Sequence, residues 1–454
     1  MNRGRAGVHQ GTAGQEDLDQ VGGRAILALA LPALPVLAAE PLYLLVDTAV
    51  VGRLGAGALG ALAVGAIVLA QVSTQLTFLS YGTTARAARL HGAGRRADAV
   101  AEGVQATWLA GGLGLVLLAL VQLLAGPVTR VLAGGGAVAA DAQGWLRIAS
   151  CGIPLVLVTL AGNGWMRGVQ DTVRPLRYVL VGNGVSAVVC PVLVHGVGWG
   201  LPGSAAANVL AQVLSAGLFL RALAAERRTG AVPVRPDPAK IRAQLVLGRD
   251  LVLRSLAFQA CFLSAAAVAA RSGAATVAAH QVVLQLWTFT SLVLDCLAVA
   301  AQALVGAALG AGRVAGARVL AWRVARWSTA FAAVIALGLA AAHSVLPRVF
   351  TPDPAVLAVV PQAWWFLVAV VPVAGVVFAL DGVLLGAGDA AFLRTATLGC
   401  ALLGFLPLVW FSELAGWGLR GIWAGLTVFV VLRMVTVVAR VRSDRWAVAG
   451  AVRT

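Results

Sequence analysis

Two carboxylates lie in a long apolar stretch near the amino terminus. Glu40 and Asp47 occur in LAAEPLYLLVDTAVVG, and their spacing of seven residues places them on roughly the same face of a helix. A charged side chain within a bilayer is costly and marks a functional site by default. We therefore predict a functional role for Asp47. The alternative is a structural carboxylate that is held by a neighbouring helix.

Prolines surround the first of these carboxylates. Glu40 directly precedes Pro41, and Pro32 and Pro35 lie upstream. Proline frees backbone carbonyl groups and bends a helix, so this segment would suit a gate that carries a carboxylate. Equally, Glu40 could lie at an exposed cavity wall and keep that wall hydrated.

The composition indicates which elements must position these groups. Of 454 residues 60% are hydrophobic and only 11% are charged, whereas soluble domains have about 25% charged residues. Long uncharged stretches favour helices over the short alternating segments of a membrane β-barrel. We predict an all-α integral membrane protein with twelve transmembrane helices. The expected spans are residues 25–51, 57–85, 103–129, 148–166, two within 178–220, 255–270, 272–312, 327–347, 355–380, 395–412 and 421–432.

The net charge of +16 has a topological explanation. Arginines and the only lysine, Lys240, concentrate in alternate loops, at residues 86–96, 167–177, 221–249 and 313–326. Cytoplasmic loops of membrane proteins carry such an excess, so both termini are expected to be cytoplasmic. This distribution argues against a nucleic-acid partner. The five cysteines form no metal-binding spacing, and we expect neither a metal nor a cofactor.

The two halves of the chain share an internal repeat with an offset of 218 residues. Matching pairs include Arg53 with Arg271, Pro154 with Pro372, and Trp199 with Trp417. Six helices per half give both halves the same orientation, an arrangement found in secondary transporters. No P-loop pattern is present, so a gradient must supply the energy. The expected domains are an N-terminal tail 1–23, an N-lobe 24–223, a cytoplasmic linker 224–243, a C-lobe 244–440 and a C-terminal tail 441–454.

Several motifs resemble the MATE family of cation-coupled drug exporters, and its DinF-like branch in particular. They lie at residues 29–55, 167–175 (RGVQDTVRP), 249–262 (RDLVLRSLAFQACF), 278–295 and 379–390 (ALDGVLLGAGDA). The resemblance runs from about residue 24 to 440. It implies two six-helix bundles, alternating access, and export of organic cations or other toxic compounds in exchange for H⁺ or Na⁺. It also implies that Asp47 is the coupling carboxylate and that the membrane is the bacterial plasma membrane.

The chain departs from that family in the fifth helix. Many members carry Asn and Asp four residues apart, but Ser186 and Cys190 occupy the matching positions here, and Asn183 lies one turn earlier. Sodium needs several oxygen ligands, whereas a proton needs one carboxylate shielded from water. We therefore expect H⁺ to be the coupling ion, bound by Asp47 with Glu40 and Asn183 nearby, and Na⁺ to be the alternative.

The second half offers a candidate polar site. Asp295 and Asp381 would form a second titratable site or contacts between the lobes, and His280 is expected in hydrogen-bonded packing or, alternatively, in a proton relay. Arg254 lies one turn after Asp250, which predicts a local ion pair. Asp171 and Asp389 are predicted to cap helices or occupy turns.

Cargo would be a small organic cation or amphiphile, and membrane lipids would be the other partners of a monomer. The residues predicted to line the cavity are Tyr43, Gln71, Gln75, Gln259, Gln285, Trp287 and Phe289. Trp364 and Trp365 are expected at the membrane interface.

A flippase for lipid-linked precursors remains the alternative transporter, although the central charges found here are acidic. A membrane-embedded enzyme is disfavoured, because neither paired carboxylates for a metal diphosphate nor a long catalytic loop is visible.

Overall fold

The computed structural model describes residues 28–451, except for the side chains of residues 39–42 and 74. Every regular element in this range is a helix, as the sequence predicted. Eleven described helices are long and apolar enough to cross a membrane, and the number is twelve if a bent pair of helices forms one span. The chain folds into two compact units, which divide between Gly248 and Arg249. We call Pro32–Gly248 the N-lobe and the other unit, which runs from Arg249 onward and also includes the described residues 28–31, the C-lobe.

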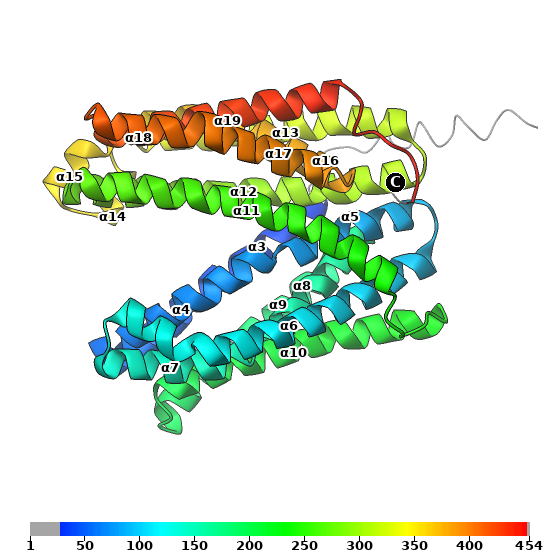
Figure 1. The fold of residues 1–454 in the computed structure, drawn as a ribbon, viewed down its shortest axis with the longest axis horizontal. Helices are drawn as coiled ribbons and strands as arrows, with labels where there is room; N and C mark the ends of the chain where they lie inside the picture. The colour runs from blue at the N-terminus through cyan, green and yellow to red at the C-terminus, as the bar shows by residue number, and fades with distance from the viewer. Residues whose placement is uncertain (1–27, 452–454) are drawn as a thin grey trace, which may run out of the picture. The chain divides into compact units, whose positions relative to one another are not determined.

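The N-lobe is a bundle in which α3 packs on α9, α9 on α10, and α5 and α6 on α8 (Figure 1). A kink of 44° separates α7 from α8, which together form the bent crossing. Its helices are α3 (Ala33–Val51), α4 (Ala56–Leu76), α5 (Phe78–Gly92), α6 (Arg96–Ala133), α7 (Gly136–Ser150), α8 (Ile153–Gly168), α9 (Val173–Pro191) and α10 (Leu201–Thr229). A short 3₁₀ turn η1 (Gly52–Leu54) follows α3, and a π-helical turn η2 (Val192–Gly196) follows α9.

The C-lobe is built around α12 and α16, which pack on each other and are its most enclosed long helices. The helix α11 (Pro238–Arg271) carries the boundary between the two units. The other helices are α12 (Ala274–Gly310), α13 (Val314–Ala341), α14 (Leu346–Phe350), α15 (Pro354–Val359), α16 (Pro361–Gly386), α17 (Ala390–Cys400), α18 (Leu406–Leu414) and α19 (Gly418–Arg442). A π-helical turn η3 (Ala401–Phe405) joins α17 to α18.

The backbone repeats with the same 218-residue offset as the sequence. Five turn positions with positive φ recur in the second half at this offset. The pairs are Gly55 and Gly273, Gly94 and Gly312, Gln170 and Gly388, Gly198 and Gly416, and Gly200 and Gly418. Gln170 and Gly388 share this conformation although the side chains differ. The repeat is therefore present in the backbone conformation as well as in the sequence.

Helix packing repeats in the same way. A Cβ atom on Gly164 of α8 would collide with the backbone of Ser80 on α5, and one on Gly382 of α16 would collide with the backbone of Ala298 on α12. Both members of the first pair are 218 residues before their counterparts. Each lobe therefore brings two helices into backbone contact at the same place.

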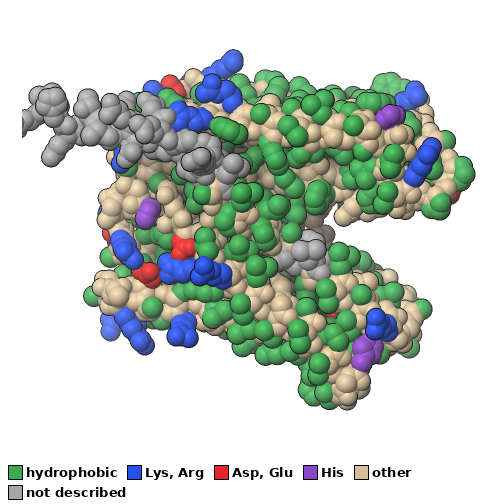
Figure 2. Space-filling model, turned by 180° about the vertical axis from the view of Figure 1, so that it is seen from behind, with side chains coloured by type: hydrophobic (Ala, Val, Ile, Leu, Met, Phe, Trp, Pro, Cys, Tyr) green, Lys and Arg blue, Asp and Glu red, His purple; other side chains and the backbone are tan. Residues whose placement is uncertain are grey.

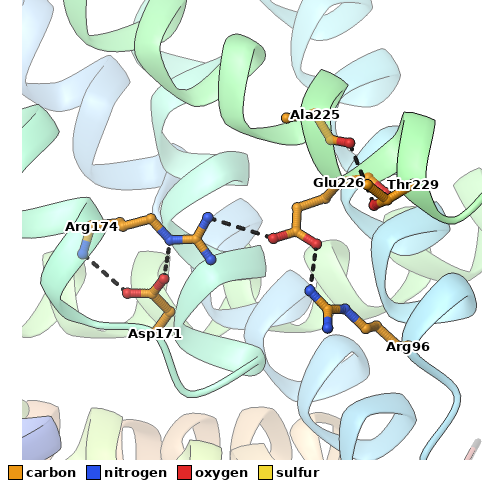
Figure 3. Close-up of polar contacts among 6 residues, drawn as sticks. All are labelled: Arg96, Asp171, Arg174, Ala225, Glu226 and Thr229. Carbon is orange, nitrogen blue, oxygen red and sulfur yellow. Dashed lines mark hydrogen bonds and ion pairs between the residues drawn. The ribbon is translucent and has the colours of Figure 1, made fainter.

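Ion pairs tie helix ends together in the N-lobe. The carboxylate of Asp171 accepts a hydrogen bond from the backbone N–H of Arg174 at 3.0 Å and also pairs with the Arg174 side chain (Figure 3). Glu226 on α10 pairs with Arg96 at 2.7 Å and with Arg174 at 3.6 Å. The starts of α6 and α9 are thus linked to the end of α10. Asp171 lies in the turn just before Thr172, the N-cap residue of α9, so of the two predicted roles the structure shows the turn position.

The other predicted cap behaves differently. Asp389 occupies the N-cap position of α17, but its side chain makes no capping hydrogen bond. Its carboxylate instead accepts a hydrogen bond from Nε of Arg440 at 2.7 Å, and this contact joins α17 to α19.

Trp364 does not contribute to an exposed aromatic belt, contrary to the prediction. Its side chain is buried, and its Nε1 donates to the carbonyl oxygen of Leu339 at 3.1 Å. The adjacent Trp365 is 53% exposed and packs beside His343. Consecutive residues on a helix point about 100° apart, so one indole enters the C-lobe core while the other faces outward.

The outer surface has the polarity of a membrane protein. Hydrophobic side chains cover much of the face in Figure 2, and Lys and Arg lie mainly towards the ends of the helices. Beyond α19, Trp446 is fully buried and the backbone N–H of Gly450 donates to Leu309. The described part of the predicted C-terminal tail therefore packs on the C-lobe.

Candidate functional site

Asp47 lies on α3 with only 1% of its surface exposed. The thiol of Cys190 on α9 donates to its Oδ1 at 3.4 Å, and the Ser204 side chain of α10 also interacts with the carboxyl group. Its Oδ2 makes no well-formed hydrogen bond within the described residues. The carboxyl group is therefore shielded from water, and one of its two oxygens is left without a hydrogen-bond partner in the described chain.

Three helices surround this carboxylate with polar residues spaced four apart. The six residues, which we call the N-lobe polar cluster, are Tyr43 and Asp47 on α3, Ser186 and Cys190 on α9, and Ser204 and Asn208 on α10. Residues four apart lie on one face of a helix, so each helix turns one polar face inward. Tyr43, predicted to line a cavity, is buried and interacts with Ser186 and Asn208.

Hydrogen bonds to the surrounding scaffold orient the cluster. The Trp145 indole donates to the Ser204 hydroxyl oxygen at 3.2 Å, which leaves the Ser204 proton free to point to Asp47. The Ser186 hydroxyl donates to the carbonyl oxygen of Ala207 at 3.2 Å. The side chains around Asp47 are thus held in place while its own charge is left uncompensated.

The absence of a basic partner separates Asp47 from the other buried acids of the described chain. Each of the other four forms an ion pair with at least one arginine. The pairs are Glu102 with Arg86, Asp250 with Arg394, Asp381 with Arg433, and Asp389 with Arg440. A buried charge without a counter-ion is costly, so a carboxylate kept in that condition is suited to taking up a cation.

The C-lobe contains a second buried charged group. Asp381 on α16 accepts hydrogen bonds at Oδ2 from Arg254 of α11, at 2.6 Å, and from Arg433 of α19. Asp250 instead pairs with Arg394 at 2.6 Å and with Arg249 at 3.0 Å. The predicted local pair of Arg254 with Asp250 is therefore wrong, because the guanidinium reaches inward to another helix.

The family model MatE matches residues 32–192 and 251–410, one segment in each half of the chain. The chain belongs to the MATE family. Protein DETOXIFICATION 44, chloroplastic, of Arabidopsis thaliana is 32% identical, over 91% of this chain and 81% of that protein. DNA damage-inducible protein F of Escherichia coli (strain K12) is also 32% identical, over 92% of this chain and 91% of that protein.

Solved MATE structures share the fold. A crystal structure of MATE in the bent conformation gives a TM-score of 0.85 at 21% identity and covers 96% of this chain and 97% of that one. A transporter of the MOP superfamily from Pyrococcus furiosus, described as having a binding pocket of reverse polarity, gives a TM-score of 0.82 at 20% identity, with the same coverage. As a MATE-family member, the protein is a membrane transporter.

Two predicted neighbours of Asp47 have different outcomes. Asn183 donates through its amide to the carbonyl oxygen of Val179 at 2.9 Å, within its own helix. Asn183 therefore lies one turn before Ser186 on α9, and its amide bonds to its own helix instead of to Asp47. The side chain of Glu40 lies outside the described residues.

The other predicted cavity residues are scattered. Gln71 on α4 is exposed and Gln75 is half-buried, and neither belongs to the N-lobe polar cluster. In the C-lobe, Trp287 lines a cavity with Asp381, whereas Gln259, Gln285 and Phe289 are not among the residues that line it.

The candidate polar site of the C-lobe is only partly assembled. Asp295 is half-buried, and neither it nor His280 lines the cavity around Asp381. His280 is buried beside Trp423, with ring centroids 6.2 Å apart, and neither ring nitrogen has a hydrogen-bond partner within the described residues. The expected packing is present, but the expected hydrogen bond is not.

Sequence reasoning missed Ser204, Asn208 and Arg433. The first two form a polar pair four residues apart in LPGSAAANVL, a signal that was available. Arg433 lies in the apolar run VVLRMVTVV of the last span, where an arginine calls for a buried acidic partner.

Proposed function

We propose that this MATE-family protein exports small organic cations or amphiphiles across the bacterial plasma membrane in exchange for protons, by alternating access. The proton would bind Asp47. The observation that carries this proposal is the buried position of Asp47 without a basic partner, in contrast to four other buried acids. The relative from Deinococcus radiodurans, 30% identical over 92% of this chain, is named as a probable multidrug resistance protein.

Protonation provides the coupling step. A proton on Asp47 removes the uncompensated charge of the N-lobe polar cluster, whereas its release restores a site that attracts a cation. Proton and cationic cargo would therefore occupy the carboxylate in turn. Exchange of one for the other moves cargo outward as protons enter.

The chemistry of the cluster favours a proton over sodium. A hard cation such as Na⁺ prefers several oxygen ligands. Here Oδ1 of Asp47 faces the sulfur of Cys190, and the Ser186 hydroxyl is turned to the backbone. A proton requires only the carboxylate itself.

Orientation follows from the basic loops. Residues 86–96, 167–177, 221–249 and 313–326 carry most of the arginines, which favours a cytoplasmic location for these loops and for both termini.

Ethidium efflux tests the function directly. In a bacterial strain lacking its own drug pumps, the wild-type protein should lower cellular ethidium, and Asp47→Asn should reduce the efflux rate at least tenfold at equal membrane abundance. The matched control is Asp141→Asn, which makes the same change at an exposed aspartate of α7. Undiminished efflux by Asp47→Asn would contradict the proposal.

A further inference from the structure

A cavity of about 270 Å³ lies within the C-lobe, around Asp381. The helices α11, α12, α16 and α19 contribute its walls. This volume is close to the lower limit of small-molecule sites, and it has room for a body of one or two aromatic rings. None of its lining residues belongs to the N-lobe polar cluster.

The charges in this cavity do not balance. Arg254 and Arg433 both donate to Oδ2 of Asp381, and Asp381 is the only acid among the lining residues. The side chains of Asp381 and Arg433 are 7% and 6% exposed, and that of Arg254 is 16% exposed. Two guanidinium groups against one carboxylate leave one excess positive charge in a largely buried place.

Hydrogen-bond donors remain unused beside that charge. The Nε of Arg254 and the Oγ of Ser291, which both belong to lining residues, are buried and have no hydrogen-bond partner within the described chain. Within the ion cluster of Arg254, Asp381 and Arg433, Oδ1 of Asp381 is the one acceptor without a hydrogen-bond partner. An incoming anion could therefore take two donors that the protein leaves open.

Aromatic rings support the guanidinium groups. The Cζ of Arg433 lies 4.9 Å from the ring centroid of Phe258 and 6.0 Å from that of Phe429, and the Cζ of Arg254 lies 5.7 Å from Phe258. Cation–π contacts of this kind hold arginines in place away from water. Trp287 adds a further aromatic wall.

We propose that this cavity binds an amphiphilic monoanion, namely a carboxylate or sulfonate on an apolar ring system. The acid group would accept hydrogen bonds from Arg254 and Ser291 and offset the excess charge of Arg433, while the ring packs against the aromatic wall. A cationic ligand would be repelled by the same excess charge. This inference goes beyond the proposed function, because it does not depend on Asp47.

Three probes that share one ring system test the preference for an anion. The full-length protein in phosphatidylcholine nanodiscs would be titrated calorimetrically with 1-naphthoate, 1-naphthalenemethanol and 1-naphthylmethylammonium, and empty nanodiscs would correct for partition into lipid. The naphthoate should bind at least tenfold more tightly than the ammonium compound, with the alcohol in between. Equal affinities, or tighter binding of the cation, would overturn the proposal.

Substitutions locate the site. Arg254→Gln and Arg433→Gln should each weaken naphthoate binding at least tenfold, whereas Asp381→Asn should tighten it because a competing anion is removed. The matched control is Arg394→Gln, which breaks the Arg394–Asp250 pair outside the cavity and should leave binding unchanged.

If Arg433→Gln does not fold, Asp381→Asn still distinguishes an anion site from a purely structural ion cluster. A structural cluster predicts weaker or unchanged naphthoate binding by Asp381→Asn, which would overturn the proposal. These titrations measure binding without any transport, so failure of the efflux proposal would remain distinguishable from failure of this one.

Discussion

At the scale of single residues, the buried acid of the N-lobe polar cluster differs from that of the C-lobe cavity because it has no basic partner. Asp381 has two arginine partners, whereas Asp47 has a thiol and hydroxyl groups as neighbours. Breaking a buried ion pair typically costs about 3–5 kcal/mol. Changing Asp47 breaks no such pair, so its substitution should affect transport far more than folding.

The pair Ser186 and Cys190 should determine the choice of coupling ion. Restoring Asn and Asp at these positions in the double variant Ser186→Asn/Cys190→Asp supplies an amide and a second carboxylate next to Asp47, which are ligands that suit Na⁺. We expect a sodium gradient to drive export by this variant but not by the wild type, measured as ethidium uptake into inside-out vesicles. The control Ser186→Asn/Cys190→Asn has the same size without the charge. A wild type that already responds to sodium would contradict this prediction.

The sequence was sufficient to find Asp47 but not its full surroundings. A carboxylate in an apolar run is conspicuous because of its cost, whereas Ser204 and Asn208 are small polar residues that occur in many membrane helices. The partners of Asp381 lie 127 and 52 residues away, so spacing along one helix could not reveal them. The same limitation led to the wrong pairing of Arg254 with Asp250.

At the scale of helices, close packing depends on positions where a side chain cannot be accommodated. Gly164 and Gly382 allow backbone contact between neighbouring helices at equivalent places in the two lobes. Such contacts suit membrane helices, which associate mainly through tight van der Waals packing.

Gly382→Ala should destabilise the protein. The new Cβ would collide with the backbone of Ala298, and overpacking of this kind typically costs about 1–3 kcal/mol. We expect a lower melting temperature of the purified protein in detergent, followed by tryptophan fluorescence. The control is Gly399→Ala on α17, where nothing lies within 4 Å and better helix propensity adds up to about 1 kcal/mol. Equal melting temperatures for the two variants would argue against close helix contact at Gly382.

Helix number was easier to predict than helix shape. Length and hydropathy identified twelve crossings, but not the 44° bend between α7 and α8. The predicted span 148–166 covered α8 and only the end of α7, because Asp141, Gln143 and Arg147 interrupt the apolar pattern of α7. A crossing that includes polar residues gives a weak hydropathy signal.

At the scale of the whole molecule, the 218-residue repeat connects sequence and structure. The sequence anchors, the positive-φ turns and the helix contacts all follow one offset. The π-helical turns do not: η2 begins at Val192 and η3 at Ala401, which are 209 residues apart. The fifth crossing of each lobe has therefore diverged within a shared plan.

Topology can be tested with reporter fusions. The basic loops predict that the C-terminus and the segment between α10 and α11 are cytoplasmic, and that the segment between α13 and α15 is external. A fluorescent protein fused after the last residue should fluoresce, and alkaline phosphatase fused after Thr351 should be active. If alkaline phosphatase fused to the C-terminus were active, the C-terminus would be external and the predicted orientation would be wrong.

Proton-driven transport by the purified protein tests the central claim most directly. In proteoliposomes with an imposed pH gradient and no sodium, the wild-type protein should accumulate a monovalent organic cation about tenfold per pH unit if one proton exchanges for one cation. Asp47→Asn should accumulate none, although Asp141→Asn should match the wild type. Accumulation by Asp47→Asn under the pH gradient, or a wild-type protein that transports only with sodium, would contradict the account.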